Sequence, residues 1–314
     1  MSSGLNNLFK FAVTGILIFL LGSQIAKHKD EFLYLYLREI SAVQFFIITA
    51  VVIASIITNA SKLKALAGSY NIKLKNGEVL GLSSITTSLN NFFFKAGSLF
   101  TSNYLKRRYE FPFMSFAGSQ GADHLILFFS NALCGLAVSA TLMASHKGVF
   151  VPLTLCYFSV ALFLILIFSK TLDLRYRSNK FLNALIRAIN SLYRILKNKK
   201  LFYFLCAHNT AIVGLNTLRF FLVCKVLALN IPFGYCLLFV TLVPFVSAIP
   251  IIHSDIGTRE LIIGIYSQWL GLGFQTGMLA TLLDRCFVLI WTIIISLYFR
   301  NFFTSMETAR STTH

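Results

Sequence analysis

Apolar residues gather in long runs along this chain, and short polar or basic segments separate the runs. Runs long enough for a helical membrane span cover residues 9–26, 40–58, 114–144, 149–169, 201–228, 233–252 and 275–299. A hydrocarbon core about 30 Å thick needs roughly 20 apolar residues per helical crossing. The pattern therefore predicts seven firm transmembrane helices.

Two further stretches are apolar but interrupted. Residues 79–103 are rich in Ser, Thr, Asn and Gly and contain Lys95, while residues 259–273 are too short to cross unless tilted. Short or polar hydrophobic segments are typical of re-entrant or broken helices, which often line binding sites. We expect an all-α polytopic membrane protein: one integral membrane domain over residues 1–314, with about 7–8 transmembrane helices and one or two re-entrant or broken helices.

The longest hydrophilic segment, residues 170–200, carries nine Lys or Arg residues and one acid, Asp173. Between the charges, apolar residues recur at spacings of three and four, which predicts an amphipathic helix with a basic face. Such a helix suits an anionic membrane surface. A solvated connector between two halves of the protein explains the pattern equally well, and both readings stay open.

Composition supports the membrane assignment. Hydrophobic residues make up 56% of the chain and charged residues only 12%, and the mean hydropathy is +0.73. The formal charge of +17 resides mostly in segments between apolar runs, among them Lys62 to Lys75, Lys106 to Arg108 and 170–200, which the positive-inside rule places on the cytoplasmic side. This pattern argues against a nucleic-acid partner. The six cysteines form no CxxC pair, so no metal site or disulfide framework is expected.

Ionisable side chains inside apolar runs are costly and mark candidate sites. Lys95, Asp123, Arg219, Asp284 and Arg285 are in such positions. The alternative is a structural ion pair or buried amide between helices. Since adjacent helical residues point about 100° apart, we expect Asp284 and Arg285 to face different partners.

Polar residues also interrupt the stretch 249–264, IPIIHSDIGTRELIIG. Pro250 limits the helix before it, Ser254 or Asp255 can cap a new helix near Ile256, and Gly257 allows close backbone approach. The new helix would present its unpaired N–H groups with Arg259 in the first turn, a combination that attracts a phosphate. Glu260 would act as a counter-ion or proton carrier. Metal ligation and acid/base catalysis are weaker readings, so we expect neither a metal nor an enzyme.

The same stretch resembles the Pro-Ile-Ser-x-Gly-Gly-Leu-Gly-x-Arg-Glu signature of the flippase-like membrane domain of lysylphosphatidylglycerol synthases. Residues 280–285, ATLLDR, resemble the last helix of that family, which carries an Arg at the position of Arg285. Residues 94–98 and 104–109 resemble its Gly-Arg-x-Gly-Glu segment and basic continuation, with Ser98 in place of the Glu. The resemblance implies a helical bundle with re-entrant segments. We expect a stand-alone member without the soluble aminoacyl-transfer domain.

The leading hypothesis is therefore a transporter that moves a lipid or lipid-linked glycan with an anionic head group between leaflets. Its expected site residues are Lys95, Asp123, Arg219, Asp255, Gly257, Arg259, Glu260 and Arg285. The alternative is a non-transporting accessory protein of a cell-envelope polysaccharide or glycolipid pathway. Expected partners are membrane lipids and envelope-biosynthesis enzymes, in a prokaryotic cytoplasmic membrane; no cofactor is expected, and the sequence leaves the oligomeric state open.

Overall fold

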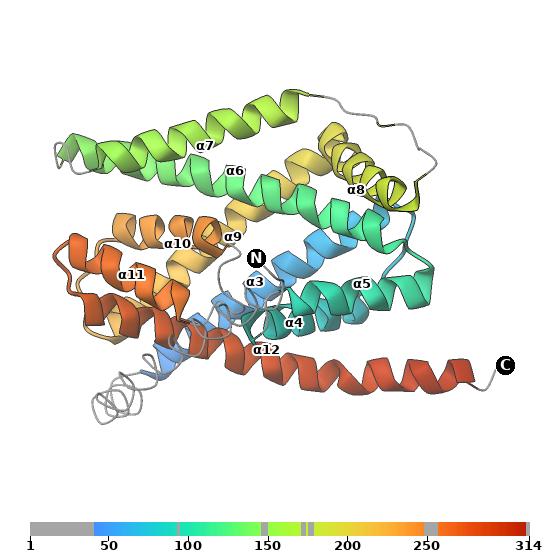
Figure 1. Cartoon of the computed structure of the whole chain (residues 1–314). Helices are drawn as coiled ribbons and strands as arrows, with labels where there is room; N and C mark the ends of the chain where they lie inside the picture. The colour runs from blue at the N-terminus through green and yellow to red at the C-terminus, as the bar shows by residue number, and fades with distance from the viewer. Residues whose placement is uncertain are drawn as a thin grey trace, which may run out of the picture.

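The structure is a computed structural model that describes residues 41–92, 95–145, 150–170, 174, 179–247 and 257–311. Within these residues the chain forms ten helices and no strand (Figure 1). The helices are α3 (Ala42–Gly68), α4 (Asn76–Phe92), α5 (Ala96–Tyr109), α6 (Phe113–Ser145), α7 (Val151–Ser169), α8 (Lys180–Lys197), α9 (Lys199–Val226), α10 (Phe233–Ser247), α11 (Thr258–Trp269) and α12 (Phe274–Ser311).

Five of these helices, α3, α6, α7, α9 and α12, are long and apolar enough to cross a membrane. They correspond to five of the seven predicted spans, so the expected all-α polytopic architecture is confirmed. The predicted span at 9–26 lies outside the described residues. The predicted span at 233–252 corresponds to α10, whose 15 residues reach only about 22 Å at 1.5 Å per residue.

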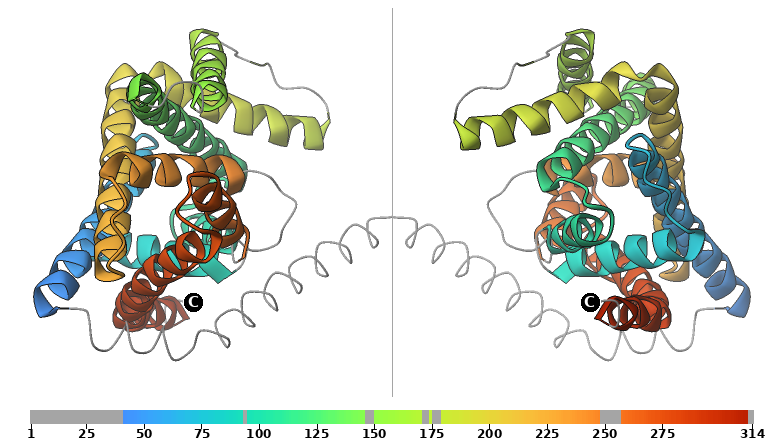
Figure 2. Two further views of the ribbon diagram at one scale, coloured as in Figure 1. Left: turned by 90° about the vertical axis from the view of Figure 1, so that its left-hand side faces the viewer. Right: turned by 90° about the vertical axis from the view of Figure 1, so that its right-hand side faces the viewer.

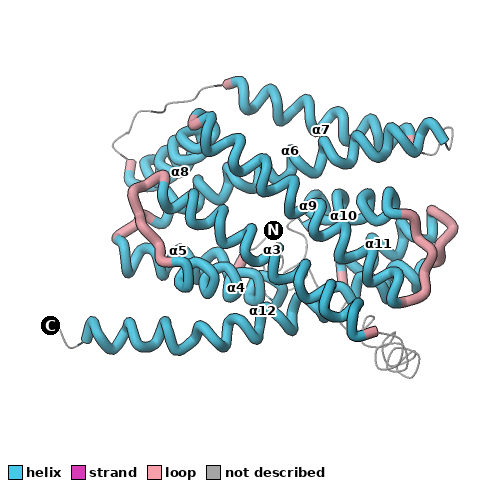
Figure 3. The backbone as a smooth tube through the Cα atoms, turned by 180° about the vertical axis from the view of Figure 1, so that it is seen from behind, coloured by secondary structure: helices cyan, strands magenta, loops and turns pink. Residues whose placement is uncertain are grey.

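The described loops gather at two ends of the helical body (Figure 3). One end, called here the basic end, holds the loops after α3 and α5 together with α8. The opposite end holds the loops between α9 and α10 and between α11 and α12. A chain of alternating crossings produces this arrangement, because each spanning helix returns the chain to the other end.

Helix α8 forms the amphipathic connector predicted for 170–200. It lies across the direction of α6 and α7 at the basic end (Figures 1 and 2). Its buried Ile186, Tyr193 and Ile195 face the bundle, whereas Phe181 stays 77% exposed. At Gly118 of α6 the two backbones are so close that a Cβ would meet the carbonyl oxygen of Ala188. The connector is therefore packed on the bundle along part of its length.

Helices α4 and α5 form an antiparallel pair over the ambiguous stretch 79–103. Their lengths of 17 and 14 residues correspond to about 25 and 21 Å. The start of α4 and the end of α5 are adjacent, since the Tyr109 hydroxyl donates to the Glu78 carboxylate at 2.9 Å. The start of α4 and the end of α5 therefore both lie at the basic end.

Helices α10 and α11 form a second short pair. The Phe150 ring contacts Tyr235 near the start of α10 and Trp269 at the end of α11, each at a centroid distance of 6.2 Å. Both ends of this pair therefore lie at the opposite end of the body. Helix α10 packs on α6 and α9, and α11 packs on α12.

Candidate functional site

The most charged buried site joins α9, α11 and α12. Arg219 of α9 makes a two-pronged ion pair with Asp284 of α12: its Nε donates to Oδ1 at 2.6 Å and its Nη2 donates to Oδ2 at 2.9 Å. The guanidinium of Arg219 also donates to Asn216 Oδ1 at 3.0 Å, one helical turn earlier. Bidentate arginine–carboxylate pairs fix orientation as well as charge, so this contact sets the angle between α9 and α12.

The first turn of α11 completes the site. Arg259 Nη2 donates to Asp284 Oδ2 at 3.0 Å, so one carboxylate serves two arginines. Glu260 forms an ion pair with Arg285 of α12 at 3.1 Å, and its other oxygen accepts from the Gly257 N–H at 2.8 Å. Asp284 and Arg285 thus face different partners, as expected from their adjacency.

Burial makes these charges energetically important. The side chains of Arg219, Arg285, Glu260 and Asp284 are 6% exposed or less, whereas that of Arg259 is 18% exposed. Among the described residues the cluster contains three arginines and two carboxylates. Moving charges out of water costs several kcal/mol per ion unless partners compensate, so each of these charges depends on its ion-pair partners.

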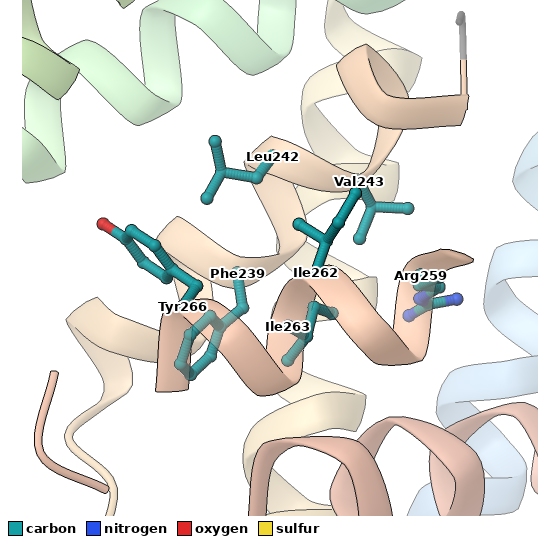
Figure 4. A pocket seen from close by; sticks show the side chains of 7 residues that line it. All are labelled: Phe239, Leu242, Val243, Arg259, Ile262, Ile263 and Tyr266. Carbon is teal, nitrogen blue, oxygen red and sulfur yellow. The ribbon is translucent and has the colours of Figure 1, made fainter. Parts of the chain in front are cut away.

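A small cavity adjoins Arg259 between α10 and α11 (Figure 4). Its volume is about 10 Å³, close to the minimum for a single water. Apart from Arg259 the lining is apolar or aromatic, made of Phe239, Leu242, Val243, Ile262, Ile263 and Tyr266. One cation at the edge of an apolar lining matches the chemistry of an amphiphile with an anionic head group.

A second buried network ties α3, α6 and α9. Lys62 Nζ donates to Asp123 Oδ2 at 2.9 Å and to Asn209 Oδ1 at 2.8 Å, and the Asn209 amide donates to Asp123 Oδ1 at 3.0 Å. The Lys62 side chain is 7% exposed. Lys62, which was expected in a cytoplasmic basic cluster, therefore lies inside the bundle, where the carboxylate of Asp123 compensates its burial; its side of the membrane stays a prediction.

A third cluster holds the base of the α4 and α5 pair. The carboxylate of Glu78, which is fully buried, accepts from the hydroxyls of Tyr104 at 2.7 Å and Tyr109 at 2.9 Å and lies 3.4 Å from Arg108 Nε. Burial, followed by the hydrogen bond to Glu78, raises the pKa of Tyr104. The phenol therefore stays protonated and available as a donor, which indicates a structural role.

A wider groove of about 490 Å³ lies at the basic end, between α8 and the segment joining α5 to α6. Tyr70, Arg187 and Arg194 line it together with Ser191. The Arg194 guanidinium stacks over the Tyr70 ring at 4.8 Å and donates to the Ser69 carbonyl. Exposed Arg187 gives the groove a positive charge at the end where α8 lies.

The expected site residues fall into separate groups. Arg219, Arg259, Glu260, Arg285 and Gly257 come together as described above. Asp123 belongs to the Lys62 network. Lys95 precedes α5 as its N-cap, with φ of 56°.

The expected cap at Ser254 or Asp255 lies outside the described residues, and α11 begins after Gly257 as its N-cap. Sequence reasoning gave Asp284 no place in the proposed site, although it is the hub of the cluster. It also missed the roles of Lys62 and Asn209. The available signal was an acidic residue inside an apolar run, because the charge of such a residue must be compensated by cations on other helices. In the part of the chain that the structure describes, no group of three or more His, Cys, Asp or Glu side chains could hold a metal ion.

The fold and these buried ion pairs define a polytopic helical membrane protein with charged groups inside the bundle. A family model of the lysylphosphatidylglycerol synthase TM region matches residues 7–296, nearly the whole chain, so the protein belongs to this family. Neither the curated proteins nor the solved structures contain a match to the chain.

Proposed function

We propose that this protein is a flippase-like transporter that moves a lipid, or a lipid-linked glycan, with a phosphate-bearing head group between the leaflets of a prokaryotic cytoplasmic membrane. The observation that carries the proposal is the position of Arg259. It stands in the first turn of a helix that begins inside the bundle, it borders the cavity, and within the described residues its buried Nε has no hydrogen-bond partner.

A phosphate would bind by taking over part of the role of Asp284. The Asp284 carboxylate is shared between Arg219 and Arg259, so an entering phosphate can pair with Arg259 while Arg219 keeps its two-pronged bond. The amides at the start of α11 add a partial positive charge to the same place. Acyl chains would stay against the apolar lining of the cavity, whose residues come from α10 and α11.

The two short helix pairs support a transport path through the bundle. Each pair is too short to cross, and each starts and ends at one end of the body, so we assign both as re-entrant hairpins. Irregular backbone at membrane depth is tolerated where it is buried in protein or lines a cavity. Lys95 next to the tip of the α4 and α5 pair would contribute a second cation to the path, and Asp255 would balance charge beside α11.

A second candidate function is a non-transporting accessory protein that holds a lipid carrier for envelope-biosynthesis enzymes. The ion pairs favour it, because Asp284 pairs with Arg219 and Glu260 pairs with Arg285 and the adjoining cavity is only about 10 Å³. A binder needs the cavity to open on one side alone, whereas a transporter needs access from both.

Leaflet exchange in proteoliposomes tests the proposal. Fluorescent phosphatidylglycerol and phosphatidylcholine analogues would be compared for the wild-type protein, Arg259→Gln and the control Lys225→Gln, which neutralises an exposed lysine of α9. The proposal expects faster exchange of the anionic lipid, lost in Arg259→Gln and kept in Lys225→Gln. Binding of the anionic lipid without exchange would favour the accessory function.

A further inference from the structure

The order and length of the helices repeat. Helices α3, α4, α5 and α6 form the series long, short, short, long, and helices α9, α10, α11 and α12 form the same series. Helices α7 and α8 join the two units. The first unit starts at the opposite end, reaches the basic end and sends its short pair inward from there. The second unit starts at the basic end and sends its short pair inward from the opposite end, so the two units have inverted topology.

The correspondence extends to single residues. The residue number rises by 157 from Ala42 to Lys199, where α3 and α9 begin, and from Asn76 to Phe233, where α4 and α10 begin. The same offset takes Lys62 to Arg219. An offset of 161 takes Phe113 to Phe274, where α6 and α12 begin, and takes Asp123 to Asp284.

The two ion pairs are therefore equivalent, since each joins a cation of the first long helix to an aspartate of the last. Asn59 and Asn216 stand at equivalent positions three residues before the two cations.

Packing follows the same rule. Helix α4 packs on α12, and its counterpart α10 packs on α6, while α3 and α9 pack on each other. A Cβ at Gly77 would lie 3.3 Å from Phe299, and a Cβ at Gly234 would lie 3.4 Å from Val138. Gly77 and Gly234 differ by 157 and Val138 and Phe299 by 161, so these contacts are counterparts too.

The two short pairs nevertheless differ at one place. In the first pair, a Cβ on Gly97 of α5 would lie 2.1 Å from the Thr86 carbonyl oxygen, so α4 and α5 are in direct backbone contact. The hydroxyls of Thr86 and Thr101 are also 2.6 Å apart.

The residue number rises by 162 from Ala96 to Thr258, where α5 and α11 begin. This offset takes Gly97 to Arg259 and Thr101 to Ile263, while the offset of 157 takes Thr86 to Val243. Arg259, Val243 and Ile263 all line the cavity between α10 and α11 (Figure 4). A closed helix contact in one unit thus corresponds to a cavity in the other.

Helix α10 also contains a weak point beside this cavity. Pro244 lies inside the helix, where it lacks the N–H that would donate one turn back and so favours a kink or break. Its counterpart in α4 is Thr87, whose hydroxyl adds a bond to the Ser83 carbonyl at 2.9 Å. The second pair therefore lacks a backbone N–H donor at a position where the first pair has one.

From these observations we infer that the chain consists of two inverted-topology repeats, residues 42–145 and 199–299. In this arrangement the α4 and α5 pair is the fixed member, and the α10 and α11 pair opens to admit the lipid between its helices, with the phosphate on Arg259. This inference rests on the proposed transport function and assigns its moving element. Inverted repeats commonly place a substrate site at the level of broken helices near the bilayer midplane, and the start of α11 at Arg259 corresponds to such a site in this arrangement.

Matched cross-links test the inference. Both cross-links are made in a background with the six native cysteines replaced. Thr86→Cys/Thr101→Cys allows a disulfide cross-link within the first pair. Val243→Cys/Ile263→Cys allows one at the equivalent positions of the second pair. The inference expects that oxidising the cysteine pair of α10 and α11 abolishes protein-dependent lipid exchange and that reducing it restores exchange. The cross-link between α4 and α5 should leave exchange unchanged. Equal effects of the two cross-links on lipid exchange, or full exchange by the protein cross-linked between α10 and α11, would overturn the inference.

A second variant needs no cross-link. Val243→Ile adds one methyl group to a cavity of about 10 Å³ and is expected to slow exchange while the melting temperature stays near the wild-type value; full exchange by this variant would also overturn the inference. Failure of the transport proposal has a different result, because the cysteine-replaced and wild-type proteins would then both exchange no lipid in any state.

Discussion

Replacing Asp284 with Asn probes the centre of the arginine cluster. The carboxylate accepts three hydrogen bonds from two guanidinium groups, two from Arg219 and one from Arg259. Asn keeps the shape of the side chain but removes its charge. Its NH2 group would place hydrogen-bond donors against the N–H donors of a guanidinium group. Arg219, whose side chain is 6% exposed, would be left as a buried charge without its counter-ion.

Removal of one partner from a buried ion pair costs about 3–5 kcal/mol. We take the lower half of this range, because Arg259 is 18% exposed and can be partly solvated. The free energy of unfolding of Asp284→Asn should therefore fall by about 3–4 kcal/mol. The control Glu110→Gln changes an exposed acid and should stay within about 0.5 kcal/mol of wild type.

Equilibrium unfolding in mixed detergent micelles, followed by the fluorescence of Trp269 and Trp291, measures this difference. The double variant Arg219→Gln/Asp284→Asn removes the stranded charge and should be more stable than Asp284→Asn alone, giving a coupling free energy in a double-mutant cycle. A loss below about 1 kcal/mol in Asp284→Asn, or additive effects in the cycle, would refute the reasoning, since a buried mutual dependence requires both.

Three further changes have defined outcomes. Gly97→Ala should destabilise the protein by about 1–3 kcal/mol through overpacking against Thr86, whereas Gly214→Ala, in open space on a helix, should be neutral or stabilising in the same unfolding assay. Gly118→Ala should loosen α8 from α6 and raise hydrogen–deuterium exchange in residues 180–197; unchanged exchange there would contradict the close backbone contact. Asp123→Asn should destabilise less than Asp284→Asn, because Asn209 still accepts from Lys62; an equal or larger loss would contradict this ranking.

Much of the fold could be predicted from the sequence because apolar length decides which helices cross a membrane. The runs at 114–144 and 149–169 became α6 and α7 with boundaries shifted by no more than two residues. The run at 233–252 looked the same by composition, but the described helix α10 has only 15 residues, contains Pro244 and packs on α11. A local pattern cannot distinguish these outcomes, because the second helix of a short pair is specified by tertiary packing.

The site was predictable only in part. Arg259, Glu260 and Arg285 were found because charge inside an apolar segment is rare. The pairing of Lys62 was missed because its compensating carboxylate, Asp123, is 61 residues away, and no local sequence pattern indicates that contact.

The internal repeat was equally hidden. Its two halves share few residues and differ at Thr86 and Val243, so only helix lengths and equivalent contacts reveal it.

The most direct test of the central claim is lipid exchange by the reconstituted wild-type protein and Arg259→Gln, at matched protein-to-lipid ratio, with phosphatidylglycerol and phosphatidylcholine analogues in parallel. If the buried arginine cluster carries an anionic head group across the membrane, the wild type accelerates exchange of the anionic lipid above protein-free liposomes and Arg259→Gln does not. Equal exchange of both lipids by both proteins would contradict the account.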